Sequence, residues 1–222
     1  MNLVFPRLYA IIDPTLLNVS ELAVAEALAG SGVELIQYRN KTASTRQFFK
    51  ISLQLSQMLK PTRARFIVND RADIAMLTGA GGVHVGQEDL GVEEARAIVG
   101  GSGVKECLVG VSTHTVEQVA AADRTSADYI AFGPVFPTAT KQNADAVVGT
   151  DLLRRVRRMT AKPLVAIGGI TLERAAEVYR AGADSLAVIR DLISAANPGD
   201  RAREYLAVAS SLTPGQSGPA SG

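Results

Sequence analysis

Polar and charged side chains follow several short apolar runs of this sequence, and their types suit phosphate chemistry. One such segment is Gln37–Lys41. If it continues an extended strand, alternation places Gln37, Arg39 and Lys41 on one side, away from the two residues between them. An amide and two cations on one side suit a polyanionic ligand such as pyrophosphate. A solvated charged turn accounts for the same spacing equally well.

Two carboxylates follow the next two apolar runs. Asp70 comes after the run 65–68, and Asp89 comes after the run 82–85. Carboxylates at the ends of adjacent strands can meet on one hard cation, and Mg²⁺ is favoured because it takes one or two carboxylates and completes its shell with phosphate oxygens and water. Each aspartate is also suited to cap a helix. Beside a cationic segment, a magnesium site and a pair of helix caps remain equal alternatives.

A second candidate anion site lies further along the chain. Gly168 and Gly169 separate an apolar run from a helix-like segment that begins at Thr171. Paired glycines let backbone N–H groups approach an anion at a helix N-terminus. The preceding loop, 133–141, holds two prolines, two threonines and a final lysine. We expect these two segments to bind a second phosphate.

Three other features are interpreted as structural. His84 lies inside an apolar run and is expected to be a hydrogen-bonded interior residue rather than a metal ligand. Cys107 is expected to be a small buried residue. The basic run 154–158 lies on an amphipathic segment, so it predicts a solvated helix face rather than a nucleic-acid site.

These residues need a scaffold, and the sequence repeats one theme: an apolar run, a polar or glycine-rich turn, and a helix-period segment. The expected strands are 8–12, 33–38, 65–68, 82–85, 108–111, 129–132, 164–167 and 185–189. The expected helices follow Ser20, Thr45, Thr150 (as an N-cap) and Thr171, with further ones at 73–77, 93–99, 116–122 and 201–212. Continuous apolar runs indicate strands buried on both faces, hence a parallel sheet. Eight βα units predict a single-domain α/β fold, a (β/α)8 TIM barrel over 1–212, with working residues at the C-terminal strand ends and a disordered tail over 213–222.

Composition limits the partners. The 222 residues are 47% hydrophobic and carry a net charge of +1. We therefore expect no extended positive electrostatic field that would attract nucleic acid or an acidic membrane. The first apolar run is too short for a signal peptide or a membrane span. A lone cysteine fits a reducing cytoplasm. We therefore expect a cytoplasmic protein that acts on small molecules; the oligomeric state cannot be read from the sequence.

Taken together and in order, the motifs resemble those of one family. They are Gln37-x-Arg39-x-Lys41, Asn69-Asp70, His84-x-Gly86-Gln87-x-Asp89, Gly110-Val111-Ser112, Gly133-Pro-x-x-Pro-Thr138-x-Thr140-Lys141 and Ile167-Gly-Gly-Ile170. This order and spacing are similar to those of thiamine-phosphate synthases, from about Tyr9 to Ile193. The resemblance implies that a hydroxymethylpyrimidine diphosphate is joined to a thiazole phosphate, with release of pyrophosphate, through a pyrimidine-methyl cation.

The resemblance also implies site residues. Arg39, Lys41 and Lys141 would be catalytic, and Asp70 and Asp89 would bind one Mg²⁺ per site. The pyrimidine diphosphate would be bound by Gln37, Tyr38, Arg39, Asn40, Lys41, Asn69, Ser112 and Lys141. The thiazole phosphate would be bound by Thr138, Ala139, Thr140, Gly169, Ile189 and Arg190.

Two residues depart from the family pattern: Asn40 stands where glutamate is common, and Arg190 stands where serine is usual. Arg190 therefore places a longer, charged side chain beside the expected thiazole-phosphate site.

Two alternative functions are a thiazole tautomerase-like isomerase and a non-catalytic barrel that binds thiazole or thiamine phosphates. Neither needs the carboxylate pair and the cationic segment that this sequence carries.

Overall fold

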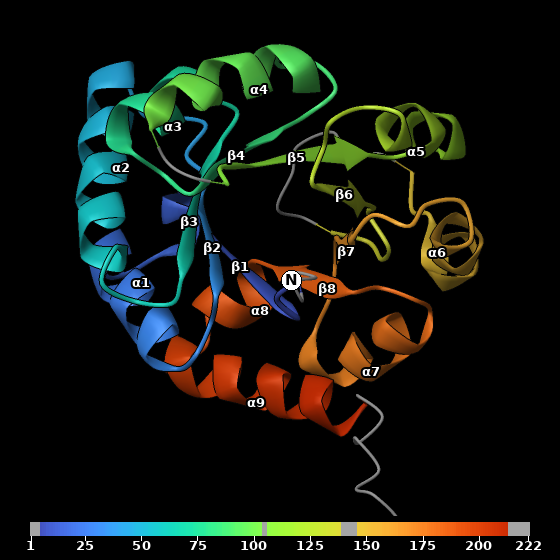
Figure 1. The fold of residues 1–222 in the computed structure, drawn as a ribbon. Helices are drawn as coiled ribbons and strands as arrows, with labels where there is room; N and C mark the ends of the chain where they lie inside the picture. The colour runs from blue at the N-terminus through green and yellow to red at the C-terminus, as the bar shows by residue number, and fades with distance from the viewer. Residues whose placement is uncertain (1–4, 104–105, 139–145, 213–222) are drawn as a thin grey trace, which may run out of the picture.

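A computed structural model describes residues 5–103, 106–138 and 146–212 (Figure 1). Eight parallel strands form one closed barrel in chain order, from β1 next to β2 through to β8 next to β1. The strands are β1 (Leu8–Ile12), β2 (Leu35–Tyr38), β3 (Arg65–Asn69), β4 (Gly82–Val85), β5 (Leu108–Thr113), β6 (Tyr129–Phe132), β7 (Leu164–Ile167) and β8 (Ser185–Val188). The predicted (β/α)8 barrel is confirmed. The tail predicted to be disordered, 213–222, lies outside the described residues.

Helices surround the barrel, and most of them cover the outer face of the strands that precede them (Figure 1). They are α1 (Glu21–Gly30), α2 (Thr45–Leu59), α3 (Ala72–Thr78), α4 (Val92–Val99), α5 (Val116–Asp123), α6 (Gly149–Arg157), α7 (Leu172–Arg180), α8 (Arg190–Ile193) and α9 (Pro198–Ser211), with 3-10 turns at Pro14–Leu16 and Gly100–Ser102. In α6 the buried residues are Leu153 and Val156. The last helix, α9, packs between α1 and α7 and closes the ring.

Local capping explains where several helices begin. Ser20 accepts a hydrogen bond from the Ala23 N–H, and Ser44 forms a capping box with Gln47. The prediction that Thr150 caps its helix is wrong: α6 begins at Gly149, after Val148. The Thr150 hydroxyl instead donates to Glu177 Oε1 at 3.1 Å, because it already lies within the first turn.

Alternation along the strands divides the apolar residues between two clusters. The outer cluster lies between strands and helices, whereas the inner cluster fills the barrel. Phe5, which precedes β1, belongs to the inner cluster and packs against the ring of Tyr129 with 5.1 Å between ring centroids. The barrel is therefore filled at the N-terminal end of its strands.

Gly110 on β5 makes room for Tyr129 on β6. A Cβ at position 110 would lie 2.0 Å from the Tyr129 Cζ atom. We expect Gly110→Ala to lower the free energy of unfolding by about 3 kcal/mol, since the ring is fully buried and cannot move without displacing its neighbours. Urea unfolding measures this loss. Gly30→Ala is the matched control, because its Cβ meets open space; a loss for Gly110→Ala no larger than the control's would contradict the prediction.

Candidate active site

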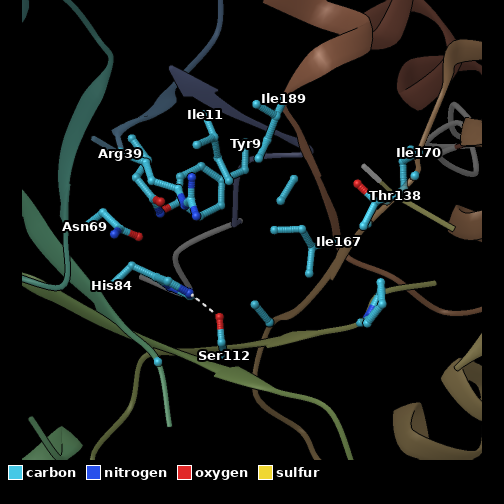
Figure 2. A pocket seen from close by; sticks show the side chains of 18 of the residues that line it. Tyr9, Ile11, Arg39, Asn69, His84, Ser112, Thr138, Ile167, Ile170 and Ile189 are labelled. Atoms are coloured by element: carbon cyan, nitrogen blue, oxygen red, sulfur yellow. Dashed lines mark hydrogen bonds between the residues drawn. The ribbon is translucent and has the colours of Figure 1, made fainter. Parts of the chain in front are cut away.

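A cavity of about 900 Å³ opens at the C-terminal ends of the strands (Figure 2). Its volume is at the upper end of the range typical of small-molecule sites. Most of the predicted site residues line it together: Gln37, Arg39, Lys41, Asn69, Asp70, Asp89, Ser112, Thr138, Gly169, Ile189 and Arg190. Predicted residues Ala139, Thr140 and Lys141 lie outside the described residues. The two anion sites expected from separate motifs therefore share one cavity.

Two predicted side chains do not line this cavity. Tyr38 stacks on Phe48 of α2, with 5.1 Å between ring centroids, and its hydroxyl faces Glu21 Oε1 at 3.4 Å. The Asn40 side chain donates to the Tyr38 hydroxyl at 3.1 Å and accepts the backbone N–H of Thr42 at 3.0 Å. Both side chains thus stabilise the layer between strand and helix, as strand alternation predicts.

The two cations of the β2 end each hold a carboxylate. Arg39 Nη1 lies 2.6 Å from Asp13 Oδ2, and Asp13 is almost fully buried after β1. Lys41 is paired with Asp70. Because these pairs fix the cations by opposite charge, the cations are already oriented before any ligand binds. Asp13 closes the first apolar run in the sequence, but local pattern gave no sign that it is a partner of Arg39.

Neither Asp70 nor Asp89 caps a helix, so the capping alternative is wrong. The N-cap of α3 is Arg71 and that of α4 is Gly91. Asp70 has a positive φ of 62°, and its N–H donates to the His84 carbonyl at 2.7 Å. Asp89 Oδ2 accepts the Gly86 N–H at 2.7 Å. The left-handed backbone and the tight turn place the two carboxyl groups close enough for the Asp89 carboxylate to raise the pKa of Asp70.

The electrostatics of this pair suit a cation. Burial raises the pKa of the Asp70 carboxyl; Lys41 lowers it, and the Asp89 carboxylate raises it again. Two adjacent carboxylates repel one another unless positive charge lies between or beside them. No group of three or more His, Cys, Asp or Glu that could hold a metal occurs among the described residues. A cation here would therefore take these two carboxylates and complete its shell with other oxygens.

A buried polar network lies beneath the cation and carboxylate groups. His84 Nδ1 lies 3.1 Å from the Tyr129 hydroxyl, and His84 Nε2 lies 2.8 Å from Ser112 Oγ (Figure 2). The Tyr129 hydroxyl also contacts that of Tyr9 at 2.9 Å, and Gln37 Nε2 donates to Tyr9 at 2.6 Å. Burial lowers the pKa of His84 to about 4, so the ring is neutral at pH 7. The prediction of a hydrogen-bonded interior histidine is confirmed.

The other side of the cavity is built from the β6 and β7 loops. Gly168 and Gly169 have φ of 98° and 63°, and a Cβ on Gly168 would lie 2.4 Å from the Pro134 side chain. The Phe136 N–H donates to the Gly168 carbonyl at 3.0 Å, which ties the two loops together. Thr171 is the N-cap of α7, as predicted. The glycines and the start of α7 line the cavity. Ile167 and Ile170, which flank the glycine pair, lie across the cavity from Arg39 and Asn69 (Figure 2).

Sequence reasoning missed Arg174, which lines the same side. Its guanidinium lies over the Phe136 ring, 4.5 Å from the centroid, and Nη1 donates to the Gly169 carbonyl at 2.9 Å. A cation in the first turn of a helix that follows a glycine pair was the available signal. Arg190 begins α8 and is exposed at the cavity rim.

The family model described as thiamine monophosphate synthase matches residues 8–192. The chain belongs to this family. Thiamine-phosphate synthases of Koribacter versatilis and Chloroflexus aurantiacus are similar to it, at 47% identity over 214 residues and 42% over 205. The first alignment covers 93% of this chain and 97% of the relative, and the second covers 92% and 93%.

A solved structure of the thiamine monophosphate synthase family supports the same assignment. The thiamine phosphate pyrophosphorylase of Pyrococcus furiosus superposes with a TM-score of 0.82 at 32% identity, over 92% of this chain and 96% of that one. The chain is thus a transferase of thiamine biosynthesis with thiamine-phosphate synthase activity. Within the described residues, none of the helices is both long and apolar enough to cross a membrane.

Proposed function

We propose that the enzyme joins 4-amino-2-methyl-5-hydroxymethylpyrimidine diphosphate to 4-methyl-5-(2-phosphoethyl)thiazole, or to its 2-carboxy form. The products are thiamine phosphate and pyrophosphate, together with carbon dioxide when the thiazole carries the 2-carboxy group. One observation carries the proposal: a side lined by cations and carboxylates and a side lined by glycines share a single cavity. Two separate anion sites in one cavity suit two phosphorylated substrates that must meet.

The proposed reaction begins with ionisation. The bond between the pyrimidine methylene carbon and the diphosphate oxygen breaks, its electron pair leaves with pyrophosphate, and the thiazole nitrogen then captures the methylene cation. Negative charge on the departing group grows during this step, so Arg39, Lys41 and Lys141 stabilise the transition state more than the ground state. No general base strong enough to remove a proton is required before bond breaking. The diphosphate is further held by Gln37, Asn69 and Ser112.

Magnesium fits the carboxylate pair. With Arg39 paired to Asp13 and Lys41 to Asp70, the positive charge of the β2 end is largely neutralised in the free enzyme. A polyanionic substrate therefore needs additional positive charge, and Asp70 and Asp89 supply the oxygen ligands that Mg²⁺ prefers. When bound, the metal would neutralise charge on the leaving pyrophosphate.

The thiazole phosphate is assigned to the opposite side of the cavity. Thr138, Gly169, Ile189 and Arg190 line it, and Ala139 and Thr140 are assigned to it from the family pattern. Among the described residues no ion pair joins Arg190 to Asp191, whose carboxylate accepts from the Tyr205 hydroxyl at 2.7 Å and from the Leu172 N–H at 3.3 Å. The exposed arginine at the rim is therefore assigned to the ligand phosphate.

We expect Arg190→Ser to raise the KM for the thiazole phosphate several-fold, because it removes about 1 kcal/mol of charge-assisted bonding. Added salt should also weaken wild-type binding more than binding by the variant. Steady-state kinetics at two ionic strengths measures both effects. Arg180→Ser, an exposed arginine at the end of α7 away from the cavity, is the control. An unchanged KM with a wild-type salt response would mean that Arg190 points elsewhere.

The proposed function is tested by incubating the enzyme with both substrates and Mg²⁺ and assaying thiamine phosphate and pyrophosphate. Equal amounts of the two products are expected. Isomerisation of the thiazole without pyrophosphate would support the tautomerase-like alternative. Binding of thiazole or thiamine phosphate without any turnover would support the non-catalytic one.

A further inference from the structure

The interior network consists of Gln37, Tyr9, Tyr129, His84 and Ser112, and it joins five strands (β1, β2, β4, β5 and β6) by side-chain hydrogen bonds alone. Its contacts are 2.6, 2.9, 3.1 and 2.8 Å long in that order. Gln37, Tyr9, Tyr129 and His84 are each no more than 6% exposed. A buried hydroxyl or imidazole must satisfy both its donor and its acceptor within such a network, since water does not replace the missing partner.

The direction of these hydrogen bonds follows from counting protons. Gln37 Nε2 donates to the Tyr9 oxygen, so the single Tyr9 proton is directed to the Tyr129 oxygen. The Tyr129 proton is then directed to His84 Nδ1. A neutral imidazole that accepts at Nδ1 carries its proton on Nε2, and this proton faces Ser112 Oγ.

Ser112 is one end of the network, and it lines the cavity, as Gln37 at the other end also does. Its oxygen accepts from His84, so its own hydroxyl proton needs another acceptor. Among the described residues, Ser112 Oγ has no hydrogen-bond partner other than His84. Ser112 lines the cavity, so its proton is directed towards a bound ligand (Figure 2).

We propose that the interior network makes Ser112 a fixed hydrogen-bond donor to a phosphate oxygen of the diphosphate substrate, with Tyr129 and His84 as positioning residues. The reverse direction would turn the Ser112 lone pairs towards an anion, which repels them. This inference deepens the proposed function and rests on it for its kinetic test, whereas its spectroscopic test needs no substrate.

The packing around Tyr129 holds this geometry. The ring lies against Gly110, where a Cβ would meet it at 2.0 Å, and Phe5 packs below it. The His84 and Tyr129 rings are stacked at 5.6 Å with 19° between their planes. The hydroxyl of Tyr129 is therefore placed by its ring, and Tyr129→Phe removes the hydroxyl while keeping the ring.

The protein has only two histidines, so nitrogen NMR of ¹⁵N-histidine-labelled enzyme can read both tautomers. His84 should carry its proton on Nε2. His114 should carry one on Nδ1, because that atom lies 2.7 Å from the Gly133 carbonyl, which only accepts. Tyr129→Phe should shift His84 towards the Nδ1–H form, because Ser112 is then free to donate to Nε2. An Nδ1–H form of His84 in the wild type, or an unchanged His84 spectrum in Tyr129→Phe, overturns the proposal.

Kinetics provides the second readout. Tyr129→Phe should lower kcat on the order of 10-fold and leave the KM for the thiazole phosphate unchanged, since it misdirects a single donor. In a Ser112→Ala background the same change should cost little more, because its effect acts through the Ser112 hydroxyl. Additive losses in this double-mutant cycle would mean that Tyr129 acts independently of Ser112.

Tyr179→Phe is the matched control. Its hydroxyl also donates a hydrogen bond, to the Arg7 carbonyl at 2.7 Å, but Tyr179 lies outside the cavity. Its kcat and its His84 spectrum should equal those of the wild type. If Tyr129→Phe does not fold, the wild-type tautomer still decides the direction of the network. A wild-type enzyme that forms no thiamine phosphate would refute the proposed function and leave the spectroscopic result standing.

Discussion

Asp89→Asn is expected to lose magnesium-dependent turnover, with kcat falling on the order of 10²-fold or more, the scale of removing one preorganised electrostatic contact. Asparagine is the informative replacement. Its side-chain oxygen can still accept the Gly86 N–H that Asp89 accepts at 2.7 Å, so the turn after β4 is retained while the charge is lost. Asp89→Ala and Asp70→Ala should lose at least as much activity.

The same logic applies to Asp70, which has a φ of 62°. Asparagine tolerates this left-handed conformation better than alanine does, so Asp70→Asn separates loss of the metal from backbone strain. Activity is measured across a magnesium titration, and thermal unfolding confirms that each variant folds. Wild-type activity of Asp89→Asn at every magnesium concentration would show that the metal assignment is wrong.

Arg39→Gln should lower kcat on the order of 10²-fold while the KM for the thiazole phosphate stays unchanged. The guanidinium meets charge that grows as the diphosphate bond breaks, so its removal raises the barrier rather than weakening ground-state binding. We expect the same pattern for Lys141→Ala. A raised thiazole-phosphate KM with wild-type kcat in either variant would contradict the role.

A control is needed because Arg39 also stabilises the buried Asp13 carboxylate. Arg96 forms a comparable ion pair with Asp128, at the same 2.6 Å, and lies outside the cavity. Arg96→Gln should lower stability without lowering kcat. Comparing the two variants separates the loss of an ion pair from the loss of transition-state stabilisation.

The strands were predictable because burial on both faces leaves a local signature. The apolar runs at Leu8–Ile12, Gly82–Val85, Tyr129–Phe132 and Leu164–Ile167 coincide with β1, β4, β6 and β7. The observed strand ends differ from the predicted ones where polar residues continue the hydrogen-bonded strand. For example, β5 extends to Thr113, whose hydroxyl donates to the Ala131 carbonyl. Strand order and the position of the site then followed from the rules of parallel barrels.

The partners within the site were not predictable, because they depend on residues far apart in the sequence. Arg39 pairs with Asp13, which lies 26 positions away in the sequence, and His84 contacts Tyr129, which lies 45 positions away. Tyr9 meets Tyr129 across 120. Periodicity reports which face a residue occupies, not which neighbour it meets. The sequence pattern also gave no sign of the positive φ of Asp70, the conformation in which this residue does not cap α3.

The filled lower end of the barrel affects how ligands move. Phe5 and the ring of Tyr129 fill the barrel on the N-terminal side of the cavity, so among the described residues the cavity opens at one end of the barrel. The two substrates proposed above would then enter, and the two products leave, through the same opening. A ligand bound deep in the barrel cannot leave past a ligand bound nearer the opening. The order in which ligands bind and dissociate is therefore set by how deep each one lies.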